Sequence, residues 1–140
     1  TLPVRMRQYC ENALTVAKFL ESSDKIASVR YPALPGNEHY ERAQKYLPMG
    51  TSGVMSIDIK GGRAPAMKFM DSLKLACNEV HVADIRTCVL HPASTTHRQL
   101  TDQQLKDCGI GPEFIRFSVG IEDVSDIIAD LQQALAQLDE

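Results

Sequence analysis

The chain has 140 residues, a formal net charge of −3 and a hydrophobic content of 44%. This length fits one domain that can bury a core without metal or disulfide crosslinks. The charge excludes the strongly basic surface expected of a nucleic-acid-binding protein, and the apolar runs are too short to span a bilayer. No secretion signal is visible, so we expect a cytoplasmic protein without nucleic-acid or membrane partners.

The first half of the chain predicts a helix, a strand, a second helix and a second strand. They are expected over residues 4–22, 27–31, 37–46 and 54–60. The first helix rests on apolar residues that recur at steps of three and four, among them Cys10 and Leu14. In the first strand Ala27, Val29 and Tyr31 alternate with polar neighbours, as in a half-buried strand.

The second half predicts three helices and two strands. Helices are expected over residues 63–73 and 102–108 and from residue 123 onward, and strands over residues 87–90 and 114–119. Pro65 fits the first turn of its helix, where no amide hydrogen bond is lost, and Asp123 can cap the last helix. Irregular connections between these elements favour an α+β fold, with a small, mainly antiparallel sheet and helices packed on one face.

Arg116 is the residue with the most specific chemistry. Ile115 and Phe117 point to one face of the strand 114–119, so Arg116 lies on the other face beside Phe114 and Ser118. A guanidinium forms planar, two-pronged hydrogen bonds to a carboxylate, which a lysine cannot copy. Arg116 is therefore a candidate carboxylate ligand, and an ordinary solvated arginine on an exposed sheet face is the alternative.

The loop His91–Leu100 combines hydroxyl side chains with histidines. No G-x-S-x-G elbow is present, so the hydroxyls are expected to cap the loop rather than to act as nucleophiles. His91 and His97, together with His81, are the histidines that could be considered as metal ligands. The first two are six residues apart across a proline, with no carboxylate at a useful step, so this spacing predicts no metal site.

The remaining motifs point to no cofactor or crosslink. The four cysteines are Cys10, Cys77, Cys88 and Cys108, and they form no C-x-x-C pair. We expect them to be buried and reduced. The glycines at 50, 53, 61 and 62 match neither the dinucleotide-binding pattern nor the P-loop pattern.

Five segments of the chain together resemble a known family. They are Met6–Leu14, Tyr31–Pro35, Tyr46–Gly62, His91–Leu100 and Arg116–Asp123. These segments resemble the C-terminal domain of the pyridoxal phosphate (PLP)-dependent enzymes of cysteine and methionine metabolism. The third segment is most similar to the O-acetylhomoserine sulfhydrylase branch, and the resemblance spans nearly the whole chain.

The resemblance implies that residues 1–140 form the C-terminal substrate domain of an enzyme of γ-replacement or γ-elimination. In this family a lysine in a larger, preceding domain holds PLP, and no lysine here lies in the family's serine-x-threonine-lysine context. The resemblance thus implies a chain that binds no PLP and contains no catalytic residue by itself. Arg116 would bind the α-carboxylate of the amino-acid substrate, and the loop with Ser94 and Thr96 would help to shape the pocket.

The chain departs from the family pattern just before Asp84. The family has a serine or asparagine, one further residue and then a glycine, whereas this chain has His81 and Ala83 at those places. His81 can still donate a hydrogen bond to a substrate, but alanine adopts a positive φ less readily than glycine. The substrate therefore stays open at this point.

Other functions also stay open. A standalone module that binds amino acids or a protein partner without catalysis is one alternative, and an inert fragment that self-associates through an exposed apolar face is another. The resemblance itself implies a PLP-binding domain of the same enzyme as partner and a homo-oligomeric assembly.

Overall fold

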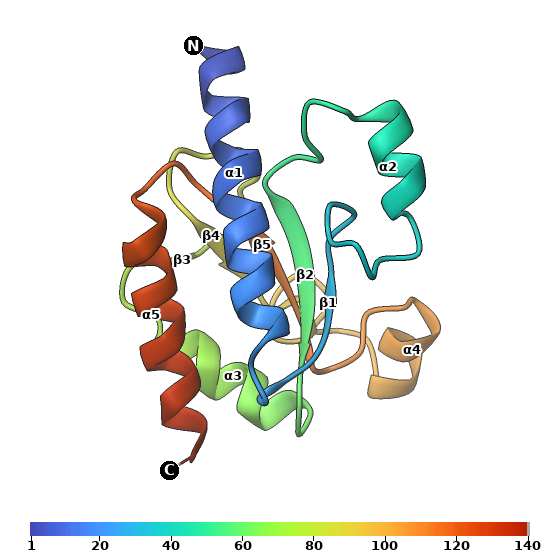
Figure 1. Ribbon diagram of the computed structural model, residues 1–140. Coiled ribbons are helices and arrows are strands. Elements are labelled where there is room, and N and C mark those ends of the chain that lie inside the picture. The colour runs from blue at the N-terminus through green and yellow to red at the C-terminus, as the bar shows by residue number, and fades with distance from the viewer. Residues whose placement is uncertain (140) are drawn as a thin grey trace.

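The computed structural model describes residues 1–139, which form a five-stranded sheet with helices around it (Figure 1). The strands are β1 (Ile26–Arg30), β2 (Val54–Ile59), β3 (Cys77–Asn78), β4 (Cys88–Leu90) and β5 (Phe114–Ser118). Their order across the sheet is β1-β2-β5-β4-β3. Only the β3–β4 pair is parallel among these neighbours. The expected α+β class is confirmed.

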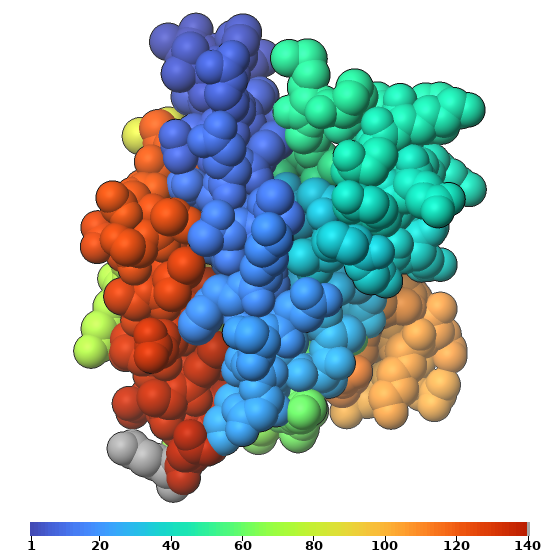
Figure 2. Space-filling model, viewed as in Figure 1, coloured from blue at the N-terminus to red at the C-terminus, as the bar shows by residue number. Residues whose placement is uncertain are grey.

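Three amphipathic helices cover one face of the sheet. They are α1 (Leu2–Glu21), α3 (Arg63–Ser72) and α5 (Val124–Ala136), and Figure 2 shows α1 and α5 side by side on this surface. The shorter helices α2 (Tyr40–Tyr46) and α4 (Asp102–Asp107) lie away from this layer. Two short 3₁₀ turns span Pro92–Ser94 and Gln137–Asp139. The helices are therefore concentrated on one side, as expected.

The core fills the space between these helices and the sheet. Ile57, Ile115 and Phe117 point inward from β2 and β5 and are fully buried. The ring of Phe117 packs against that of Phe69 on α3, with 6.4 Å between the ring centroids. The alternate residues of the same strands point away from the helices, so this burial also determines which side chains reach the second face.

Several expectations need correction. Ala27 is exposed instead of following the alternation with Val29 and Tyr31, because the β1–β2 register shifts between Ile26 and Ser28. The second helix begins at Tyr40, after a turn, and not at residue 37. The sequence also gave no sign of β3, since two residues are too few for a detectable alternation.

The cysteines are unpaired, and Cys88 alone among the four is buried. Cys10 and Cys77 are half-buried and Cys108 is exposed, so the expectation of burial is wrong for these three. Within residues 1–139, no helix combines the length and the apolar character needed to cross a membrane.

Candidate functional site

Arg116 lies in the middle of the helix-free face of the sheet. On β5 it pairs with Ser56 of β2 on one side and with Leu90 of β4 on the other. Its Nη2 donates hydrogen bonds to the carbonyl oxygens of Val80, at 2.7 Å, and His81, at 3.3 Å. Its Nε is buried and has no partner among the described residues. The guanidinium is thus held at one nitrogen and keeps an unused donor, an arrangement suited to an anionic ligand.

The loop that holds Arg116 contains a strained residue, Ala83, with φ of 60°. A left-handed conformation costs about 1–2 kcal/mol for a residue with a Cβ. Two neighbours fix it: the Ala83 amide donates to Ser118 Oγ at 3.0 Å, and Tyr9 Oη donates to the Ala83 carbonyl at 3.1 Å. The buried Ser118 therefore shares the face of Arg116 as expected, but its hydroxyl is already used to position the loop.

A second set of contacts holds the chain just after β5. The Glu122 carboxylate accepts hydrogen bonds from the amide and the hydroxyl of Thr87, at 2.6 and 2.9 Å. Asn12 Nδ2, on α1, donates to the carbonyl oxygens of Gly120 and Glu122. A Cβ at Gly120 would lie 2.4 Å from the Ile85 carbonyl oxygen, so only glycine allows this close approach of two backbones. Both ends of the loop beside Arg116 are consequently fixed.

The side chain of His81 belongs to a charged network on the surface of this loop. Its Nδ1 lies 2.8 Å from a Glu79 oxygen and 3.7 Å from an Asp84 oxygen. Arg86 contacts the same two carboxylates at 3.2 Å each. The Arg86 guanidinium, through its hydrogen bonds, lowers the pKa of Asp84 to about 2. Asp84 therefore stays ionised at neutral pH.

His91 is buried and organises the loop that follows β4. Its Nε2 lies 2.7 Å from the Pro112 carbonyl oxygen, which can only accept, and its Nδ1 lies 2.8 Å from Ser94 Oγ. The ring must then carry its proton on Nε2 and accept the Ser94 hydroxyl at Nδ1. Burial lowers the pKa of His91 and keeps it neutral.

The hydroxyls of this loop serve the loop itself, as expected from the sequence. Ser94 bonds to His91, and Thr96 Oγ1 lies 2.8 Å from His97 Nδ1. Neither hydroxyl contacts Arg116 within residues 1–139. Arg116 does pair with Leu90, which directly precedes His91, so this loop starts beside β5 at the level of Arg116.

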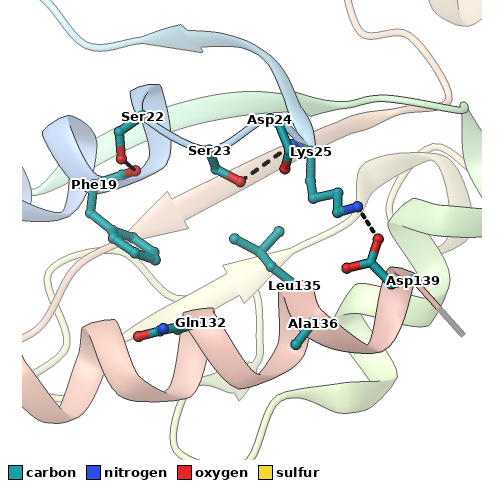
Figure 3. A pocket seen from close by; sticks show the side chains of 9 residues that line it. All are labelled: Phe19, Ser22, Ser23, Asp24, Lys25, Gln132, Leu135, Ala136 and Asp139. Carbon is teal, nitrogen blue, oxygen red and sulfur yellow. Dashed lines mark hydrogen bonds and ion pairs between the residues drawn. The ribbon is translucent and has the colours of Figure 1, made fainter.

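Two hollows of the surface bear on the position of Arg116. One of about 290 Å³ lies between the ends of α1 and α5 and is lined by nine residues, among them Phe19, Leu135 and the ion pair of Lys25 with Asp139 (Figure 3). It is on the helix-covered side, away from the face of Arg116. A smaller cavity of about 60 Å³ lies beside Ala83 and Ser118.

Comparison with known proteins gives this geometry its context. The family model for the Cys/Met metabolism PLP-dependent enzyme matches residues 1–136. This chain belongs to that family. Its relatives include two O-acetyl-L-homoserine sulfhydrylases that are both 42% identical to it. The protein of Leptospira meyeri matches 99% of this chain, and that of Thermus thermophilus matches 97%. A homocysteine synthase of Schizosaccharomyces pombe is 43% identical over 96% of this chain. The chain spans about a third of the length of these relatives, namely 31–32%.

Solved structures of the family agree in fold. A Campylobacter jejuni protein assigned as an O-acetylhomoserine (thiol)-lyase has a TM-score of 0.89 and 37% identity, covering 97% of this chain and 32% of its own length. That structure contains N'-pyridoxyl-lysine-5'-monophosphate. A Corynebacterium glutamicum structure has a TM-score of 0.87 and 36% identity.

The family's cofactor can be tested against the residues of this chain. PLP requires a lysine that can form a Schiff base in a protected site. All lysines are exposed except the half-buried Lys25, and its amine is ion-paired with Asp139 at the rim of an open hollow. The described residues therefore do not fit PLP by themselves.

Sequence reasoning proposed Arg116 and His81 as site residues but missed the residues that position them. Tyr9 and Asn12 are buried on α1, although the expected apolar stripe ran through Cys10 and Leu14. Tyr9 and Asn12 are three residues apart and therefore lie on the same side of the helix, next to the apolar stripe. This spacing is the signal that could have indicated their burial. The position of Ser118 was expected, but its bond to the loop gave no such signal, because the Ala83 amide lies 35 residues away in the irregular segment before β4.

Proposed function

We propose that residues 1–140 act as the C-terminal substrate domain of a PLP-dependent enzyme similar to O-acetylhomoserine sulfhydrylase. The observation that carries this proposal is the 42–43% identity to sulfhydrylases and a homocysteine synthase over at least 96% of the chain. The parent reaction replaces or eliminates the γ-substituent of an O-acylated homoserine. PLP, held by another part of the enzyme, would supply the electron sink when bound.

In this proposal Arg116 binds the α-carboxylate of the amino-acid substrate. Its anchored Nη2 fixes the plane of the guanidinium, and its buried, unpartnered Nε gains from a charged acceptor. A fixed carboxylate orients the carbons that react, and such positioning is a large part of catalysis. The strained loop around Ala83 serves this purpose by holding the carbonyl groups to which Arg116 bonds.

His81 would donate a further hydrogen bond to the substrate, in place of the smaller side chain expected in the family. Ser94 and Thr96 would shape the pocket through the loop that they stabilise, not by contact with Arg116. The remaining parts of the proposal are a PLP-binding domain in the same enzyme, a homo-oligomeric assembly and a cytoplasmic location.

A chimaera tests this function. In it, this chain replaces the corresponding third of the Thermus thermophilus sulfhydrylase, and homocysteine formation from O-acetylhomoserine and sulfide is measured. We expect the chimaera to be active, and the 140-residue chain with added PLP to give no more product than PLP alone. An inactive chimaera that still binds PLP would contradict the proposal and favour a binding module without catalysis.

A further inference from the structure

Three metal-ligating side chains meet at the β3–β4 edge of the sheet. Glu79, His81 and Cys88 each offer one ligand atom, and these atoms all lie within 4.8 Å of one another. In a tetrahedral zinc site, bonds of about 2.0–2.3 Å place the ligand atoms roughly 3.3–3.8 Å apart. The side chains of Glu79 and His81 are 34% and 58% exposed, so small rotations of two surface groups would close the cluster around an ion.

We propose that Glu79, His81 and Cys88 form a Zn²⁺-binding site, with Asp84 as the fourth ligand. The Asp84 carboxylate already lies 3.7 Å from His81 Nδ1. His81 would bind the ion through Nδ1, which leaves its Nε2–H able to donate to a substrate. A thiolate, an imidazole and carboxylate oxygens form a donor set that suits zinc, whereas magnesium and calcium prefer oxygen alone.

The fold brings these residues together by strand pairing. The parallel pairing of β3 with β4 places Cys77 opposite Cys88, and the Glu79 amide continues the ladder by donating to the Val89 carbonyl at 3.1 Å. In an extended segment, alternate residues share a side. The odd-numbered residues after Cys77, namely Glu79 and His81, are therefore directed to the same side as the thiol. Spacing along the sequence gave no indication of this site, because the sequence suggested only the histidines as ligands.

The charges around the cluster favour a cation. The carboxylates of Glu79 and Asp84 both lie beside His81, and that of Glu79 also lies near the buried Cys88 thiol, so negative charge is concentrated at this edge. The two carboxylates are balanced at present by Arg86, whose guanidinium contacts both. A zinc ion would take over this role and stabilise the thiolate, and the Arg86 side chain, 49% exposed, has room to turn toward solvent.

Titration of the 140-residue chain with Zn²⁺ and with Co²⁺ tests the site. We expect one ion per chain and, with Co²⁺, the near-ultraviolet charge-transfer band of a thiolate ligand. Cys88→Ser should abolish the band. Glu79→Gln, on the surface, should weaken Zn²⁺ binding by more than the roughly 10–100-fold typical of outer-shell changes. Cys108→Ser is the matched control, because this exposed thiol lies outside the cluster, and it should bind Zn²⁺ like the parent chain.

Arg86→Ala should change the Zn²⁺ affinity in the direction opposite to the ligand variants. Removal of the competing guanidinium should tighten Zn²⁺ binding, whereas a variant that merely disturbed the loop would weaken it. The proposal is overturned if the parent chain gives no cobalt–thiolate band, if the band survives Cys88→Ser, or if Glu79→Gln binds Zn²⁺ as tightly as the parent. None of these readouts depends on enzymatic activity, so the proposed sulfhydrylase function can fail while this site stands.

Discussion

Replacement of His91 by leucine should destabilise the chain by about 2–4 kcal/mol, as follows from its two hydrogen bonds. The imidazole joins the Ser94 hydroxyl to the Pro112 carbonyl inside the protein. Each such bond contributes about 1 kcal/mol net, and a buried acceptor left without a donor costs about 1–3 kcal/mol. Leucine has a similar volume but no hydrogen-bonding atoms, so the loss of stability measures mainly the hydrogen bonds and not a cavity.

Urea denaturation at pH 7.5 followed by circular dichroism gives the free energy of unfolding for this comparison. His39→Gln is the control, because His39 is an exposed histidine at the start of α2 and should change the stability by less than about 0.5 kcal/mol. A cost for His91→Leu as small as that of the control would show that the buried imidazole does not hold the loop.

The lowered pKa of His91 predicts that the stability of the parent chain depends on pH more than that of His91→Leu. The pKa of His91 is lowered in the folded chain, so the unfolded chain binds its proton more readily. The stabilisation is complete above the ordinary histidine pKa of about 6.5 and is lost as the pH falls below it toward the lowered folded value. Between pH 7.5 and 5.5, the parent chain should therefore lose more stability than His91→Leu. An equal loss in both would contradict a neutral, buried His91.

The other predictions concern Arg116 and the loop that anchors it. In an active chimaera, Arg116→Ala should lower kcat/KM by roughly 100-fold or more, since loss of a buried charge partner costs about 2–5 kcal/mol. PLP absorbance should not change, and Arg116→Lys should recover little of the lost kcat/KM. Near-normal kcat/KM, or loss of PLP, would count against carboxylate binding. Ala83→Gly should raise the free energy of unfolding by up to about 1 kcal/mol by relieving the positive φ, and a lower stability in thermal melts would argue against strain there. Tyr9→Phe removes a single hydrogen bond and should destabilise by about 1 kcal/mol; an unchanged urea midpoint would mean that the Tyr9 hydroxyl does not hold the loop.

The elements with clear periodicity could be predicted from the sequence. Strand β2 buries every second residue, and β5 does so from Phe114 to Phe117, so the alternation alone placed Arg116 on the helix-free face. The Asp123 cap was also predictable, because a side chain that accepts from an amide two residues on is a local feature. These predictions depend only on short stretches of chain.

The features that escaped prediction depend on distant parts of the chain. Tyr9 and Ala83 are 74 residues apart, and Glu79 meets Cys88 only because a two-residue strand pairs with β4. The bulge that exposes Ala27 arises from the register with β2, which no pattern within β1 reveals. The positive φ expected at the family's glycine position is retained here by Ala83, and tertiary hydrogen bonds, not residue type, maintain it.

The proposed role of Arg116 is tested most directly by comparing two ligands, one with and one without the α-carboxylate, on two enzymes, one with and one without Arg116. Inhibition constants of L-homoserine and of 3-aminopropan-1-ol, which lacks the α-carboxylate, would be measured on the active chimaera and on its Arg116→Ala variant. We expect the carboxylate to improve binding by at least about 30-fold in the parent enzyme and to have little effect in the variant, a coupling of about 2 kcal/mol or more. An equal benefit from the carboxylate in both proteins would show that Arg116 does not bind it.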